Sequence, residues 1–81
     1  MSDNIAKRVC SLIAEIMDAP PANVRPETAL KLDDLGWKGL LMIRLEIEHE
    51  FRVLIPDGAP DLWITVADVI ESTERQQRRA A

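Results

Sequence analysis

The 81-residue sequence contains few of the side chains that carry most protein chemistry. It has one cysteine, Cys10, one histidine, His49, and no tyrosine, and aromatic residues make up only 4% of the chain. One cysteine excludes an intramolecular disulfide, and one histidine without clustered thiols leaves no ligand set for zinc. We therefore expect no disulfide and no resident metal. We also expect Cys10 to pack as a small apolar group in its helix.

Long apolar runs are absent as well. Lys7, Arg8 and Glu15 interrupt the stretch from Ile5 to Met17, and no segment approaches the length of a membrane span. The same interruptions argue against a signal peptide, so the sequence predicts a cytoplasmic protein. Apolar residues make up 47% of the chain, which suffices for one core, and the length allows one domain, residues 1–81.

Positive charge and glycine are also scarce. The chain has 10 Lys and Arg against 14 Asp and Glu, a formal net charge of -4, and three glycines. An acidic balance argues against nucleic acid as the main partner and fits docking onto basic surfaces of other proteins. No glycine-rich phosphate loop and no nucleophile–base pair stands out. We therefore expect a monomer that is not an enzyme.

The spacing of the apolar residues predicts three main helices. The first runs from about Asn4 to Asp18, the second from about Gly39 to Phe51, and the third begins at about Val66. Thr65 and Asp68 form a pattern similar to a capping box at the start of the third helix. The residues expected to face the core are Ile5, Val9, Leu12, Ile13 and Ile16, then Leu40, Ile43, Ile47 and Phe51 with Leu41 and Leu45 at their flanks, then Val66, Val69 and Ile70.

The connections complete an all-α prediction. Pro20 and Pro21 end the first helix, and a long loop from Ala19 to about Lys38 follows it. We expect Val24, Leu30, Leu32 and Leu35 to pin this loop to the core. The run Val53 to Ile55 is too short to argue for a sheet, and Asp61 to Trp63 suggests one short helical turn, with Trp63 in the core or at its rim. The predicted fold is a small bundle of three main helices plus one short helix, with a core at about 4–73 and a polar, fraying tail at 74–81.

Four short motifs, in this order, resemble the acyl carrier proteins and the related peptidyl carrier domains. They are Asp34-Leu35-Gly36, Glu50-Phe51 at the end of the second helix, Ile55-Pro56-Asp57, and Thr65-Val66 before the last helix. Asn23-Val24 after the first helix also fits, and the resemblance covers roughly residues 5–71. Each motif alone is weak, whereas their joint order and spacing are fairly specific.

The resemblance implies a cofactor that this sequence has no residue to hold. In the family, a serine at the start of the second helix carries 4′-phosphopantetheine, whose thiol holds an acyl or aminoacyl group as a thioester. A helix N-terminus with its free N–H groups suits that phosphodiester. Counting from the Asp-Leu-Gly turn places the serine at Gly39, after Lys38 and before Leu40, whereas counting back from Phe51 places it at Trp37. We prefer Gly39, because Leu40 then matches the leucine that follows the family's serine. Neither residue has a hydroxyl, and the only serines are Ser2, Ser11 and Ser72.

Three interpretations remain open for function. The chain is a carrier whose attachment site has been removed, a degenerate carrier that keeps only the docking surface, or an unrelated helical interaction module. The first implies presentation of thioesters to synthases, ligases or transferases of fatty-acid, lipid or secondary-metabolite biosynthesis. The second implies binding to such enzymes without covalent cargo.

Acidic residues around the second helix are the expected docking surface. The resemblance implies that acidic residues on and before this helix meet basic patches on partner enzymes; here these are Asp33, Asp34, Glu46, Glu48 and Glu50. We also expect partner contacts at Trp37 and Arg44. An ordinary solvated helix face is an equally good interpretation, since Lys38, Arg44 and Arg52 offset the glutamates. Trp37 is either an exposed contact anchor or packs on the leucines of the long loop.

Overall fold

A computed structural model describes the backbone of residues 2–30 and 32–80, and the side chains of residues 4–30 and 36–79. These residues form three α-helices and two short 3₁₀ helices, and no strand lies among them. The elements are α1 (Ser2–Met17), η1 (Pro21–Asn23), α2 (Leu32–Phe51), η2 (Pro60–Leu62) and α3 (Val66–Ala80). The prediction of an all-α domain with three main helices is confirmed.

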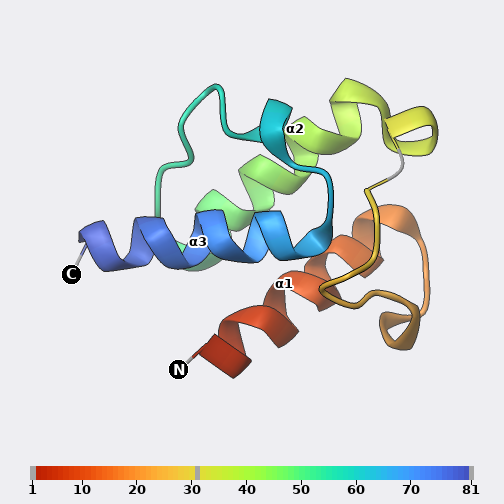
Figure 1. The fold of residues 1–81 in the computed structure, drawn as a ribbon, viewed down its shortest axis with the longest axis horizontal. Coiled ribbons are helices and arrows are strands. Elements are labelled where there is room, and N and C mark those ends of the chain that lie inside the picture. Colours follow the sequence, from red (N-terminus) through yellow and green to blue (C-terminus); the bar gives the residue numbers. More distant parts are fainter. Residues whose placement is uncertain (1, 31, 81) are drawn as a thin grey trace.

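The three helices pack around one shared core. α1 lies against both α2 and α3, and the chain ends lie on the same side of the view in Figure 1, away from the start of α2. Val9 and Ile13 on α1, Ile43 and Ile47 on α2, and Val66 and Val69 on α3 are fully buried. Burial of these aliphatic side chains is the main force that holds the helices together.

Most of the predicted core faces inward. Leu40, Phe51, Ile70, Val24 and Leu30 are buried as expected, whereas Ile5, Leu12 and Ile16 are only half-buried at the edge of α1. Trp63 is 3% exposed, and its indole N–H donates a hydrogen bond of 2.9 Å to the Ser72 hydroxyl. A buried indole with a partner for its N–H stabilises a core without an unsatisfied donor. The side chains of Leu32 and Leu35 lie outside the described residues.

The boundaries around α2 correct the sequence prediction. α2 begins at Leu32 instead of Gly39, so the first connection is shorter than predicted, and η1 interrupts it. The helical path bends at Gly36, where φ is 65° and ψ is -178°, and it continues from Trp37 to Phe51. A turn of helix before the bend is hard to foresee, because glycine next to the acidic pair predicts a loop.

Two smaller corrections concern the second half of the chain. The short helical turn is Pro60–Leu62, one residue earlier than predicted, with Pro60 at its first position. The tail was expected to fray from Glu74, but α3 continues to Ala80. Thr73 and partly buried Gln76 and Gln77 keep this half of α3 in contact with the protein.

The first connection is attached to the start of α3 by backbone hydrogen bonds. The Leu30 N–H donates to the Ile64 carbonyl at 2.8 Å, and the Val66 N–H donates to the Thr28 carbonyl at 2.9 Å. The Ala67 N–H donates to the Pro26 carbonyl at 2.8 Å. These bonds satisfy free N–H groups of the first turn of α3 and fix a segment that has little regular structure.

Half of the predicted capping pattern of α3 is present: the Asp68 carboxylate accepts backbone hydrogen bonds, whereas the Asp68 N–H donates to the Thr65 carbonyl at 3.1 Å and not to the Thr65 hydroxyl. One carboxylate oxygen of Asp68 accepts hydrogen bonds from the Ile64 N–H at 2.8 Å and the Thr65 N–H at 3.0 Å. Both hydrogen bonds lower the pKa of Asp68, and the bond from the Thr65 N–H has the larger effect. The carboxylate also lies in the first turn of α3, where negative charge is favoured.

Arg8 connects α1 to the end of α2. Its guanidinium donates to the Glu50 carboxylate and, at 3.4 Å, to the Glu50 carbonyl, and it lies 4.4 Å from the centre of the Phe51 ring. The hydrogen bond and charge of Arg8 lower the pKa of Glu50. Both side chains are about half exposed, so we expect the Arg8–Glu50 ion pair to contribute little to the free energy of unfolding.

Candidate functional site

The start of α2 is shaped by Gly36. Its φ of 65° with ψ of -178° is a backbone conformation that residues other than glycine rarely adopt. No atom lies within 4 Å of the place where a Cβ would stand, so the glycine is required by backbone conformation and not by lack of space. The bend ends the first turn of α2 and starts a regular helix at Trp37.

The structure separates the two positions that the resemblance assigned to the attachment serine. Trp37 directly follows the bend and is 70% exposed, whereas Gly39 is buried in the first turn of the regular helix. Lys38 is exposed, with its ammonium group 6.0 Å from the centre of the Trp37 ring, and Leu40 is buried. The exposed position at the helix start is therefore Trp37, the position reached by counting back from Phe51.

The residues at this helix start do not fit a phosphopantetheine arm. Attachment requires a hydroxyl, and Trp37, Lys38 and Gly39 have none. The nearest hydroxyl residue before the helix start is Thr28 and the nearest after it is Thr65, and both lie at the junction between the first connection and α3. No covalent step through the group can be derived from these side chains.

The outer face of α2 exposes an apolar stripe. Trp37, Leu41 and Leu45 follow one another at i, i+4 and i+8, so they lie on one side of the helix, and Met42 lies beside them. Their exposed fractions are 70%, 39%, 53% and 52%. We call these four residues the outer stripe. The sequence placed Leu41 and Leu45 at the flanks of the buried face, but both are exposed.

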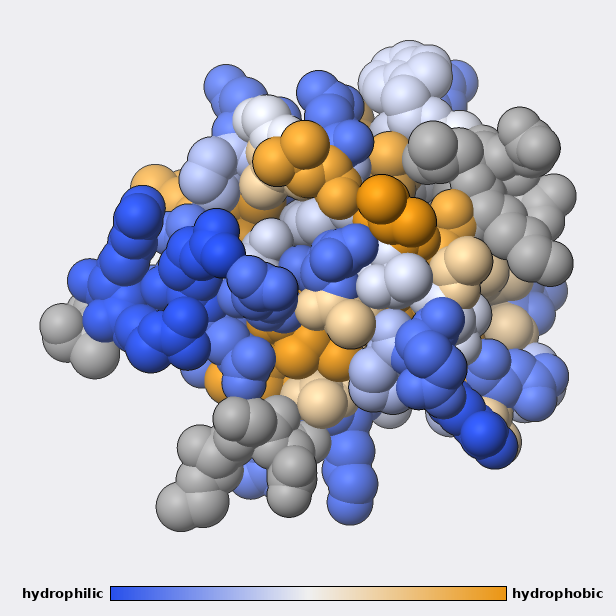
Figure 2. Space-filling view, in the orientation of Figure 1, coloured by the Kyte–Doolittle hydropathy of each residue, from blue (hydrophilic) through white to orange (hydrophobic). Residues whose placement is uncertain are grey.

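Further exposed apolar residues were missed by the sequence analysis. Leu54, Leu62 and Ile64 are 81%, 76% and 71% exposed, while Val53, Ile55 and Trp63 between or beside them are buried. Figure 2 shows apolar surface over η2 and the loops next to it. The alternation of inward and outward residues is typical of short extended segments, and applying a period of two to these runs would have found them.

A hollow opens beside the outer stripe. It has a volume of about 230 Å³ and lies between α2 and the segment that contains η2; its lining is Trp37, Leu40, Leu41, Arg44, Asp57, Pro60 and Asp61. The α2 side of the hollow has apolar side chains and the Arg44 guanidinium. The other side has the carboxylates of Asp57, which is paired with Arg44, and of Asp61. A side chain of a partner with an apolar body and a basic end fits this arrangement.

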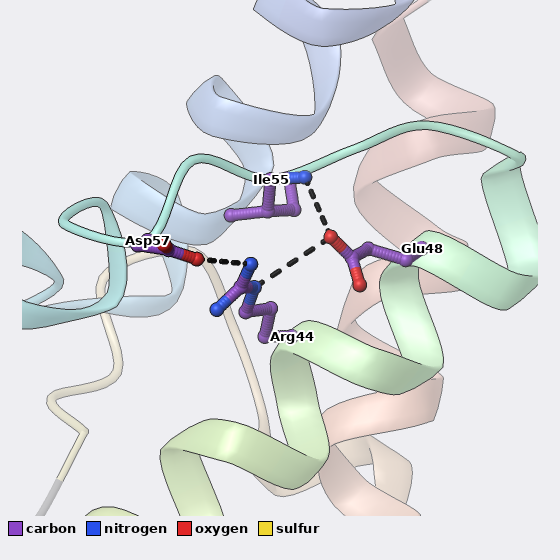
Figure 3. Close-up of polar contacts among 4 residues, drawn as sticks. All are labelled: Arg44, Glu48, Ile55 and Asp57. Atoms are coloured by element: carbon purple, nitrogen blue, oxygen red, sulfur yellow. Dashed lines mark hydrogen bonds and ion pairs between the residues drawn. The ribbon is translucent and has the colours of Figure 1, made fainter.

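Polar contacts hold the segment 55–57 against α2 (Figure 3). The Arg44 guanidinium donates to the Asp57 carboxylate at 2.7 Å, and its Nε lies 3.5 Å from the Glu48 carboxylate. The same Glu48 oxygen accepts a 2.8 Å hydrogen bond from the Ile55 N–H. The hydrogen bond to Asp57 is the main cause that raises the pKa of Arg44. We call these four residues the Arg44 network.

The predicted docking residues thus divide into separate groups. Arg44 and Glu48 are half-buried and already bond to Asp57 and Ile55 in the Arg44 network. Their charged groups therefore position the neighbouring loop and are less available to a partner. Glu46 and Trp37 are exposed and available. The backbone of Asp33 and Asp34 is helical and precedes the bend, while their side chains lie outside the described residues.

Other candidate groups do not form a second chemical centre. Within residues 2–30 and 32–80, no three His, Cys, Asp or Glu side chains lie close enough together to hold a metal ion. None of the helices in this described part is both long enough and apolar enough to cross a bilayer. Cys10 is half-buried, and burial, followed by the charge of Glu27, raises the pKa of its thiol.

A comparison with protein families found no family model that matches this chain.

Proposed function

We propose that this chain is a domain of the acyl- and peptidyl-carrier type, which docks through the start and outer face of α2 onto enzymes that transfer acyl or aminoacyl groups. In this sequence the domain docks without a covalent arm of its own, because the helix start has no hydroxyl. The observation that carries the proposal is the outer stripe, which begins at the exposed helix start where carriers hold their serine.

The chemistry of the surface supports a protein partner. An exposed tryptophan followed by leucines one and two turns later is a contact surface of the hot-spot kind, which loses water when a partner covers it. Asp57 and Asp61 beside the hollow are exposed, and the whole chain is acidic. Basic residues on the partner would speed the encounter and orient it.

Partner binding is tested with variants of the outer stripe. Binding to a synthase or ligase that accepts carrier-bound substrates is measured by calorimetry for the wild type, Trp37→Ala and Leu45→Ala. We expect each variant to weaken binding about tenfold or more. Leu54→Ala is the matched control, because Leu54 is as apolar as Leu45 and more exposed but lies outside α2. Equal losses in all three variants would contradict docking through α2.

A second candidate is a carrier scaffold whose attachment residue has been removed, so that a serine restored at this helix start would again accept the family arm. The observation that favours it is the retained frame: the Gly36 bend, the exposed position after it and the fixed Ile55-Pro56-Asp57 segment. Mass spectrometry after incubation with a phosphopantetheinyl transferase and coenzyme A separates the two. We expect no gain for the wild type and one arm's mass for Trp37→Ser.

The position of the serine sharpens this experiment. Gly39→Ser places the hydroxyl at a buried site, so we expect it to gain less of the arm than Trp37→Ser. Modification of the wild type would require attachment at another residue and would overturn docking without cargo. If neither serine variant is modified, the scaffold is not of the carrier type, and only the interaction surface remains.

A further inference from the structure

A second and larger hollow lies away from α2, between α1 and the segment that carries η1. Its volume is about 600 Å³, and its lining is Ala6, Lys7, Cys10 and Ser11 from α1, and Pro21, Ala22, Val24, Arg25 and Pro26 from the connection. Hollows of 300 to 1,000 Å³ are typical of small-molecule sites. Most of these side chains are apolar, and the carrier resemblance assigns no role to any of them.

The wall formed by the connection is held in place. The Val24 N–H donates to the Pro21 carbonyl at 3.1 Å, and the Arg25 N–H donates to the Thr28 hydroxyl at 2.8 Å. The Pro26 carbonyl accepts from the start of α3 at 2.8 Å. Prolines and these bonds restrict the wall before any ligand arrives, so little ordering entropy opposes binding.

The charge of the lining has one sign. Lys7 and Arg25 are exposed cations from opposite walls, and the lining contains no carboxylate. Neither cation belongs to an ion pair among the side chains of residues 4–30 and 36–79. Glu27 is the nearby acid, close enough to raise the pKa of Cys10. Among the residues that line the hollow, the charged side chains are therefore both cations, on a chain of net negative charge.

We infer that this hollow binds a small carboxylate with an aliphatic body, such as a free medium-chain fatty acid. The aliphatic body lies against Ala6, Val24 and the prolines, where it loses contact with water. The carboxylate lies between Lys7 and Arg25. This site is independent of the docking proposed for α2, because it shares no lining residue with the hollow beside the outer stripe.

Cys10 supplies a direct test, because the only thiol of the chain is part of the wall. The rate of Cys10 alkylation by iodoacetamide is measured with increasing octanoate, kept below the concentration at which it forms micelles. We expect alkylation to slow severalfold and to reach saturation. Octylammonium, which has the same chain and the opposite charge, should have little effect. Equal protection by both compounds, or no protection by octanoate, would overturn the inference.

Variants of the lining test the same site by a second measurement. Octanoate affinity is measured by NMR titration for the wild type, for Lys7→Gln with Arg25→Gln, and for Ala22→Trp. Two exposed ion pairs predict a loss of about tenfold in the double variant. The indole should fill the hollow and abolish binding. Arg79→Gln is the control for a lost exposed cation and should bind like the wild type.

The titration also locates the ligand. We expect amide shifts to concentrate at Ala6, Cys10, Ala22 and Val24, which line the hollow. Shifts centred on the outer stripe of α2 would place octanoate on the docking surface and would overturn this site. That result would leave the protein-binding experiment on α2 unaffected, so failures of the two proposals are distinguishable.

Discussion

Helices α2 and α3 contribute similar aliphatic side chains to the core but differ at their starts and outer faces. α3 begins under the carboxylate of Asp68, and its outward residues are mainly polar, among them Glu71, Arg75 and Arg78. α2 passes through a glycine bend and then exposes Trp37 and the leucines of the outer stripe. Folding alone accounts for the outer face of α3. The outer face of α2 carries apolar groups that folding does not bury, and the docking proposed for this face rests on them.

The largest effect is expected where the two faces of α2 are compared directly. Ile47 is fully buried and Leu45 is 53% exposed, although they are two residues apart on the same helix. We expect Ile47→Ala to lower the free energy of unfolding by about 2 to 5 kcal/mol, and Leu45→Ala to change it by less than about 0.5 kcal/mol. Urea unfolding followed by circular dichroism measures both. Similar losses would mean that the outer stripe is structural.

The next effect concerns the start of α2. Gly36→Ala must place a Cβ on a backbone with φ of 65° and ψ of -178°, so we expect a loss of about 1 to 3 kcal/mol. Gly58→Ala is the matched control, because its φ is outside the left-handed range and its surroundings are open. It should be neutral or slightly stabilising. Equal stabilities in urea would show that the bend does not constrain the helix start.

A smaller loss is expected in the Arg44 network. Glu48→Ala removes the acceptor of the Ile55 N–H and one partner of Arg44, which should cost about 1 kcal/mol. Glu46→Ala removes an exposed carboxylate that takes part in neither of these contacts, so it should lower the free energy of unfolding by less than about 0.5 kcal/mol. The melting temperatures of the two variants measure these two losses of stability. If Glu46→Ala is the more harmful change, the network does not stabilise the segment 55–57.

The smallest effect is the pH dependence of the α3 cap. The pKa of Asp68 is lowered in the folded protein by the N–H groups of Thr65 and Ile64. A carboxylate with a lowered folded pKa contributes stability that is present above its unfolded pKa of about 3.9 and is lost as pH falls through the folded pKa. We therefore expect Asp68→Asn to be less stable than the wild type at pH 7 and to lose less stability on acidification to pH 3. A parallel acid response of the two proteins would contradict this assignment.

The sequence allowed good prediction of the parts that depend on local pattern. The helical spacing of Val9 and Ile13, or of Ile43 and Ile47, predicts the buried stripes, and Thr65 with Asp68 predicts the start of α3. The turn of helix before Gly36 and the exposure of Leu41 and Leu45 were not predicted. A helix that is apolar on several sides does not reveal which side the rest of the protein covers.

The candidate site shows the same division. The Asp-Leu-Gly and Ile-Pro-Asp motifs indicated where the helix start and the following loop belong, but of the two possible counts the sequence favoured Gly39 over Trp37. Only the position of the bend showed that Trp37 is the exposed residue. The Arg44 network joins residues that are distant along the chain, and such pairings follow from tertiary packing and not from sequence spacing.

The backbone bonds between residues 26–30 and residues 64–67 have a consequence for how the molecule opens. Leu30 and Val66 each donate to the opposite segment, so breaking the junction exposes both amides to solvent at once. In hydrogen exchange, these two amides and that of Ala67 should be released together, at one opening free energy. The partners lie far apart along the chain, so closing this junction carries the entropy cost of a long loop.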